Sequence, residues 1–263
     1  IISKEKERKH IYDLKKYNIR FRKSKEKDLD NKILNNLANL PLSQSNLITY
    51  RYKQRVSLVL SKKDSLSIDE IGNKPMKFFI KWFKEADEFD KIIEANAMTV
   101  STVDKNDFPS SRVVLLKEIK DRSLIFFTNY KSKKGEAIKD NPNICASFYW
   151  PPLERQVIFK GIAKKCSSNY SDAYFRSRPF NSQVAAIISN QSQIISSYNE
   201  LLNRYNEFLK ENKNSDLKRP MHWGGVEILI DEIEFWQGRE NRLHNRVICS
   251  FTNNKWRTKI LSP

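Results

Sequence analysis

Short β-rich segments dominate the chain from residue 97 onward, and they restrict the fold more than any other feature of the sequence. Each segment combines β-branched and aromatic residues, and turn-forming residues such as those at 104–107 separate several of them. The predicted strands are 97–103, 112–117, 124–129, 144–150, 156–164, 226–236 and 247–251. Few helical segments separate them, so an antiparallel barrel or sandwich fits better than alternating βαβ units.

Four segments show helical periodicity. The clearest begins at Pro75, and its apolar residues recur at spacings of three or four from Met76 to Phe89 and Ile93. The others are 133–139, 170–176 and 198–210. The sequence therefore predicts a mainly β fold of the α+β class, with helices around the sheet.

Length and composition exclude several classes of protein. The chain has 263 residues, of which 39% are hydrophobic, so it is long enough to bury a substantial core. Apolar runs such as 184–188 stop after five residues, whereas a membrane helix needs about 20. The six glycines are placed so that neither GxGxxG nor GxxxxGK occurs, which removes the usual dinucleotide and P-loop fingerprints.

Cysteine and histidine usage argues against a disulfide framework and against a metal centre. Cys145, Cys166 and Cys249 lie far apart without a CxxC pair, and we predict reduced thiols packed in the core. Three histidines are present and HExxH is absent, so we predict no metal site. A reducing compartment, most simply the cytoplasm, is expected.

Positive charge is concentrated near the start of the chain. The formal net charge is +17, and residues 1–74 carry 18 Lys and Arg against 9 Asp and Glu. We interpret residues 1–70 as a basic, Lys/Asn-rich extension that is solvated or partly disordered, and residues 71–263 as the folded domain. A nucleic-acid-binding arm is the alternative. Organellar targeting stays open, although the acidic residues of the extension are unusual for a transit peptide.

The densest cluster of candidate functional residues follows the last long predicted strand. Arg242, His244 and Arg246 would project to one side if this segment stays extended. They could then hold an anionic ligand while Trp236 supplies a flat apolar wall. An exposed, polar strand end is the alternative interpretation.

A second candidate is the strand that opens with Arg112 and closes with Lys117. The two cations are five residues apart, so strand alternation predicts them on opposite faces. Such a strand could serve two anionic groups, or simply have charged ends in solvent.

Two further segments offer groups suited to a phosphate. Tyr174 and Arg178 are four apart on a predicted helix, and Ser182 follows. A surface pair and a helix-capping serine are the alternatives. Lys133 and Lys134 could form a phosphate clamp or a solvated first turn of a helix. None of these segments contains a nucleophile paired with a base. If the protein is an enzyme, its reactive chemistry would therefore come from a bound cofactor.

Taken together, these segments resemble the pyridoxine/pyridoxamine 5′-phosphate oxidases, the FMN enzymes that make pyridoxal 5′-phosphate. The signature is residues 233–238 followed, after three residues, by 242–246. Further similar segments occur in family order across about residues 75–263: 94–98, 112–117, 126–129, 132–135, 148–150, 153–157, 177–179, 191–192 and 223–225.

The resemblance implies a site residue by residue. FMN contacts would be Arg112, Val113, Val114, Leu115, Leu116, Lys117, Phe127, Thr128, Lys133, Lys134, Gln156, Gln191, Ser192, Trp236 and Arg246. Substrate contacts would be Lys117, Tyr174, Arg178, Ser182, Arg242 and His244, with Arg242 and His244 at the reacting ring. Phe180 stands where the family usually has a basic residue, which changes contacts at the rim.

The resemblance also implies a fold and an activity. The fold would be an FMN-binding split β-barrel of antiparallel Greek-key type, forming a homodimer with FMN at the interface. The enzyme would oxidise pyridoxine 5′-phosphate and pyridoxamine 5′-phosphate with oxygen, giving pyridoxal 5′-phosphate and hydrogen peroxide. The alternatives are another split-barrel FMN reductase or flavin-binding module and, more remotely, a basic nucleic-acid-binding protein.

Overall fold

A computed structural model describes residues 66–213 and 215–263, all within the unit Lys63–Pro263. The extension predicted for residues 1–70 lies almost entirely outside the described residues, as do the nucleic-acid-binding and targeting hypotheses attached to it. Leu66 and Ile68 already pack against the core of the domain.

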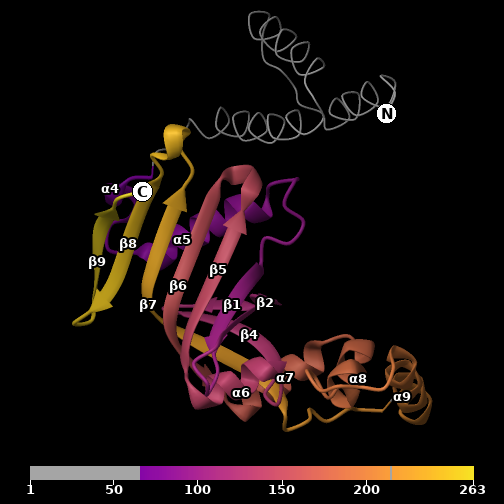
Figure 1. Ribbon diagram of the computed structural model, residues 1–263. Helices are drawn as coiled ribbons and strands as arrows, with labels where there is room; N and C mark the ends of the chain where they lie inside the picture. Colours follow the sequence, from indigo (N-terminus) through magenta and orange to yellow (C-terminus); the bar gives the residue numbers. More distant parts are fainter. Residues whose placement is uncertain (1–65, 214) are drawn as a thin grey trace, which may run out of the picture. The chain divides into compact units, whose positions relative to one another are not determined.

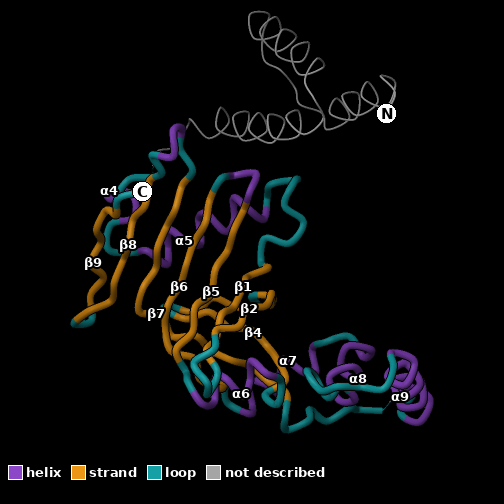
Figure 2. The backbone as a smooth tube through the Cα atoms, viewed as in Figure 1, coloured by secondary structure: helices purple, strands orange, loops and turns teal. Residues whose placement is uncertain are grey.

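In the described part of the chain, nine strands form one antiparallel sheet that curls into a split barrel (Figures 1 and 2). The path runs β2-β1-β5-β6-β7-β4-β3, and β8 and β9 continue from β7. The strands are β1 (Ala97–Val103), β2 (Pro109–Leu115), β3 (Glu118–Lys120), β4 (Ser123–Asn129), β5 (Asn143–Trp150), β6 (Arg155–Lys165), β7 (Trp223–Gln237), β8 (Asn245–Thr252) and β9 (Lys255–Leu261). This confirms the expected mainly β, antiparallel fold.

The sheet divides along the long strand β7, whose two halves pair with different strands. Its first half pairs with β4, from Trp223 to Leu229, and its second half pairs with β8, from Glu232 to Gln237. Strand β6 follows β7 along both halves, with a register shift at Gly161. A Cβ at Gly161 would lie 2.0 Å from the Leu229 carbonyl oxygen. The close approach of the two backbones at the bend therefore requires glycine.

Six helices occur in the described part of the chain; α5 crosses the sheet, and α6 to α9 lie together at the end where β7 begins (Figure 1). They are α4 (Ile68–Ile71), α5 (Pro75–Asp87), α6 (Lys133–Asp140), α7 (Ser168–Ser177), α8 (Phe180–Ile188) and α9 (Tyr198–Glu211). The helix predicted from Pro75 is confirmed, but its predicted extension through Phe89 to Ile93 is wrong. The helix ends at Asp87 in a turn, and the Ile93 side chain is 97% exposed.

The main core lies between α5 and the sheet. Phe79 is fully buried, and its ring packs against Phe148, Trp150 and Phe159 of strands β5 and β6. A smaller cluster around Phe175 joins helices α7 and α8 to the start of β7. Helices α5 and α7 thus pack on different parts of the sheet, and α9 packs against α8.

The cysteines only partly follow the prediction of core packing. All three are free thiols, but Cys249 alone is buried, and Cys145 and Cys166 are half-buried. Partial burial raises the pKa of Cys166 to about 11, which keeps it a thiol at neutral pH. Within residues 66–213 and 215–263, no helix has the length and apolar character needed to cross a membrane.

Candidate functional site

A cavity of about 750 Å³ opens where β2 and β4 meet the helices α6 to α8. Its lining contains five cations and no carboxylate, which makes it strongly attractive to anions. The lining residues are Arg112, Val113, Val114, Leu115, Lys117, Phe127, Thr128, Asn129, Lys133, Lys134, Tyr174, Arg178, Pro179, Ser182, Gln191, Ser192 and Trp223.

Lys134 is the most constrained cation of the cavity. Its side chain is buried in the first turn of α6, and its Nζ donates to Thr128 Oγ1 at 2.7 Å and Ser132 Oγ at 3.0 Å. It also reaches Gln191 Oε1 at 3.2 Å. Burial and, secondly, repulsion from Arg112 lower the pKa of Lys134 to about 8. Of the two readings of the lysine pair, the solvated first turn is therefore wrong for Lys134.

Arg112 and Lys117 line the same cavity, so the predicted opposite orientation is wrong. Alternation fails because β2 ends at Leu115 and the next two residues leave the strand. The Leu116 amide donates to Asn96 and the Lys117 amide to the carbonyl of Ile125, both at 2.8 Å. Leu116 turns into the core, at 5% exposure, and does not line the cavity.

Arg112 is held rigidly at the cavity wall. Its Nη1 donates to Thr102 Oγ1 at 2.8 Å and to the Val100 carbonyl at 3.3 Å. Partial burial lowers the pKa of this guanidinium, which stays charged because arginine starts so high.

Stacked aromatic rings form another wall. The ring centroids of Phe127 and Tyr174 are 3.7 Å apart with planes 14° from parallel, and Trp223 stacks on Phe127 at 5.4 Å. The Arg178 guanidinium carbon lies 4.5 Å from the Trp223 ring centroid. Such a wall suits a flat ring that carries an anionic group.

Arg178 has unused hydrogen-bonding capacity. Its Nη1 is buried and has no partner among the described residues. Burial lowers the pKa of Arg178, and the neighbouring Tyr174 opposes this shift. Ser182 also faces the cavity. It lies within the first turn of α8, whose N-cap is Pro179, so the helix-capping alternative for Ser182 is wrong.

The remaining candidates form a separate cluster at the other end of β7. Gln156 and Trp236 are opposite each other in the register of β6 and β7. The His244 ring lies 4.7 Å from that of Trp236, and its Nδ1 accepts from the Arg239 amide at 3.1 Å. We call Gln156, Trp236, Arg242, His244 and Arg246 the strand-end group, none of which lines the cavity.

The strand-end group does not follow the extended path assumed from the sequence. Asn241 and Arg242 have left-handed backbones, with φ of 58° and 63°, so the segment turns before β8 begins. The prediction that Arg242 to Arg246 share a side by strand alternation is therefore wrong. Arg246 pairs with Glu234 at 2.8 Å, and this hydrogen bond raises the pKa of Arg246. Burial and the nearby Arg242 lower the pKa of His244.

The cavity and the strand-end group lie at opposite ends of strand β7. Trp223 begins β7 and Trp236 lies at its far end (Figure 1). At about 3.3 Å per residue, the path along the strand between them is at most roughly 40 Å.

Sequence reasoning missed three cavity residues, namely Asn129, Pro179 and Trp223. Asn129 supports the loop after α8 through a 3.1 Å bond from Nδ2 to the Ser189 carbonyl. Trp223 stood in a segment that resembles the family, but its isolated position before two glycines gave no chemical reason to place it in a site.

The curled antiparallel sheet defines a split-barrel protein, and its cation-lined, aromatic-walled cavity has the chemistry to hold a phosphorylated ring compound. Comparisons with known proteins specify this class. Residues 84–208 match the family model described as pyridoxamine 5′-phosphate oxidase, and residues 223–263 match that of the pyridoxine 5′-phosphate oxidase C-terminal dimerisation region.

Curated relatives are similar over nearly their whole length. The pyridoxine/pyridoxamine 5′-phosphate oxidase of Flavobacterium psychrophilum is 45% identical, covering 77% of this chain and 95% of its own. The enzyme of that name from Leptospira interrogans is 43% identical, covering 76% and 93%. The chain belongs to the pyridoxine/pyridoxamine 5′-phosphate oxidase family.

Solved structures agree with the fold. PhzG from Burkholderia lata, in complex with tetrahydrophenazine-1-carboxylic acid, aligns with a TM-score of 0.71 at 25% identity, covering 76% of this chain and 98% of its own. A pyridoxamine 5′-phosphate oxidase-related, FMN-binding protein from Nostoc punctiforme aligns with a TM-score of 0.60 at 15% identity, covering 73% and 100%.

Proposed function

We propose that the chain oxidises pyridoxine 5′-phosphate and pyridoxamine 5′-phosphate to pyridoxal 5′-phosphate, with FMN as cofactor and oxygen as the final acceptor. The observation that carries this proposal is the cavity, in which five cations and a stacked aromatic wall occur without a carboxylate. Both ligands combine a flat ring with a phosphate, so one cavity chemistry serves both. The reaction itself is inferred from membership of the family.

The residues present fit FMN and a phosphorylated substrate. Lys134 and Arg112 are rigid cations beside hydroxyl groups, which suits the FMN phosphate. The unpartnered Nη1 of Arg178 suits the substrate phosphate, with Tyr174 and Ser182 beside it. A bound FMN would supply the redox chemistry, namely an acceptor for the hydride equivalent that leaves C4′ of the substrate and a route for the two electrons to oxygen as hydrogen peroxide.

The protein's own contribution is binding and orientation. Fixing the substrate phosphate at Arg178 sets the approach of its C4′ carbon, and holding two reactants in place lowers the barrier substantially. Arg242 and His244 would cover the substrate ring. Since they lie far along the chain's own sheet, we propose that a second copy supplies them in a homodimer, with FMN at the interface. The matched dimerisation region contains Trp236, Arg242, His244 and Arg246.

Substrate-dependent oxygen consumption tests the proposal. The purified protein should bind FMN with a visible flavin spectrum, and adding either phosphorylated substrate should consume oxygen and release peroxide. Ammonia should accompany the amine substrate only. A flavin-binding protein that consumes no oxygen with either substrate would instead indicate the alternative, a split-barrel FMN reductase or flavin-binding module.

A further inference from the structure

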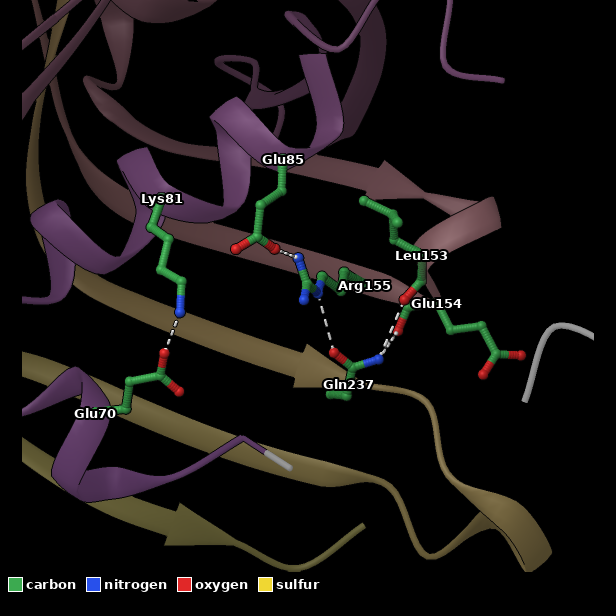
Figure 3. Close-up of polar contacts among 7 residues, drawn as sticks. All are labelled: Glu70, Lys81, Glu85, Leu153, Glu154, Arg155 and Gln237. Carbon is green, nitrogen blue, oxygen red and sulfur yellow. Dashed lines mark hydrogen bonds and ion pairs between the residues drawn. The ribbon is translucent and has the colours of Figure 1, made fainter. Parts of the chain in front are cut away.

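A polar network with two buried members, Arg155 and Gln237, joins helix α5 to the ends of two strands (Figure 3). Arg155 is 8% exposed; its Nε donates to Gln237 Oε1 at 3.1 Å, and its Nη1 pairs with Glu85 of α5. Gln237 Nε2 in turn donates to the carbonyls of Leu153 and Glu154 at 3.1 and 3.2 Å. We call Glu85, Arg155 and Gln237 the anchor network.

The anchor network lies directly behind the strand-end group. Arg155 begins β6 and Gln237 ends β7, and the two are opposite in register. The next pair along the ladder is Gln156 and Trp236. Because successive side chains point to opposite faces of a sheet, the network occupies the core face and Gln156 with Trp236 the other face.

The network also fixes the turns on which the strand-end group depends. Glu154 has a left-handed backbone with φ of 50°, and its carbonyl accepts from the Gly238 amide at 2.8 Å. From Gly238 the chain continues to Arg239, whose amide donates to His244. A shift of Gln237 would therefore also move Trp236, which precedes it, and His244, which is bonded to the segment that follows it.

The chemistry of the network favours a positioning role. The Arg155–Glu85 ion pair has one buried and one partly exposed member, and ion pairs of this kind add little net stability. An arginine fork, however, fixes distance and direction at two partners at once. The Arg155 guanidinium carbon also lies 4.5 Å from the Trp82 ring centroid, so α5 contacts Arg155 through two side chains, Glu85 and Trp82.

We propose that Glu85, Arg155 and Gln237 are positioning residues that hold Gln156 and Trp236 in the geometry needed to bind FMN in the partner copy. This inference rests on the proposed function. It gives helix α5, which has no residue in the cavity, a role in cofactor affinity.

Titration of the apo-dimer with FMN, followed by flavin fluorescence, tests the inference. Three variants weaken the network with little change in volume: Glu85→Gln removes the charge, Arg155→Lys removes the fork, and Gln237→Glu sets an oxygen against the two carbonyls. Each should raise the Kd for FMN about tenfold. The visible circular dichroism of the bound flavin should change, since it reports contacts with the ring.

The control uses an ion pair that joins the same two strands, β6 and β7. Lys160 and Glu232 pair at 2.8 Å, remote from the strand ends. Glu232→Gln should leave the Kd for FMN within about twofold of wild type. Melting temperatures of all four variants and their dimer state by sedimentation identify any loss of folding.

The outcomes are separable. If the three network variants bind FMN as the wild type does, the inference is overturned, even if their melting temperatures fall, because a merely structural network would behave in that way. If Glu232→Gln weakens FMN binding equally, the effect is general loosening of the strands and the inference also fails. A wild-type protein that binds no FMN overturns the proposed function itself.

Discussion

Arg178 is the residue whose chemistry the cavity leaves least satisfied, since its buried Nη1 has no partner in the described chain. Arg178→Ala should raise the KM for pyridoxamine 5′-phosphate about 10- to 100-fold, the usual loss for a charged hydrogen bond, and change kcat much less. Steady-state kinetics at saturating FMN measure this. Arg176→Ala removes an exposed arginine from the last turn of α7, two residues before Arg178, and should change neither constant. An unchanged KM in Arg178→Ala would remove its assigned role.

The lowered pKa of Lys134 predicts that cofactor binding depends on pH. Its pKa in the free protein is lowered to about 8, so the free protein loses this charge as the pH rises through 8. A bound phosphate favours the charged form. FMN should therefore bind most tightly below pH 8, and its Kd should rise by up to about tenfold per pH unit above that value.

The control for this titration is Lys134→Arg, which stays charged across the range. Its Kd for FMN, measured by fluorescence quenching between pH 7 and 9, should be nearly flat. A wild-type curve as flat as that of Lys134→Arg would show that Lys134 does not meet the phosphate.

At the scale of elements, sequence periodicity identified the strands and helices that have a regular apolar pattern and missed those that lack one. All seven predicted strands exist, because each carries enough β-branched and aromatic residues to be recognised. Strand β3 has only three residues, and β9 carries a cation at every second position, namely Lys255, Arg257 and Lys259. Helix α8 was missed because it begins directly after Pro179 and because its apolar residues fall mainly in one continuous run, 184–188, so that no regular spacing of three or four residues stands out.

The sequence predicted which kinds of side chain form the site, but not how those side chains are oriented. The cations and aromatic residues of the cavity could be named from their segments. The arguments from strand alternation failed at Lys117 and at Arg242 because the backbone leaves the strand there. Where a strand ends depends on hydrogen bonds to residues distant in sequence, such as that of Lys117 with Ile125, which no local pattern records.

Helix α5 should contribute strongly to stability through one side chain. Phe79 is fully buried among three aromatic rings of β5 and β6. Phe79→Ala should lower the free energy of unfolding by about 3–5 kcal/mol, since it leaves a cavity in the main core. Urea denaturation measures this, and Lys77→Ala on the exposed side of the helix should change stability by less than about 0.5 kcal/mol. Equal effects of the two substitutions would contradict the packing described here.

For the whole molecule, the separation of cavity and strand-end group makes a quantitative prediction about mixed dimers. Arg178→Ala disables the cavity and Trp236→Ala disables the strand-end group, so each homodimer should be nearly inactive at low substrate and FMN concentrations. A heterodimer of the two has one site built from both intact groups and one site built from both altered groups.

Random exchange of equal amounts makes about half of the dimers heterodimers, so about one quarter of all sites should become intact. Mixing the two inactive variants should therefore restore about one quarter of wild-type oxygen consumption. If one chain supplied both groups to its own site, every site in the mixture would carry one altered group and no activity would return. Mixing either variant with itself under the same conditions measures the background.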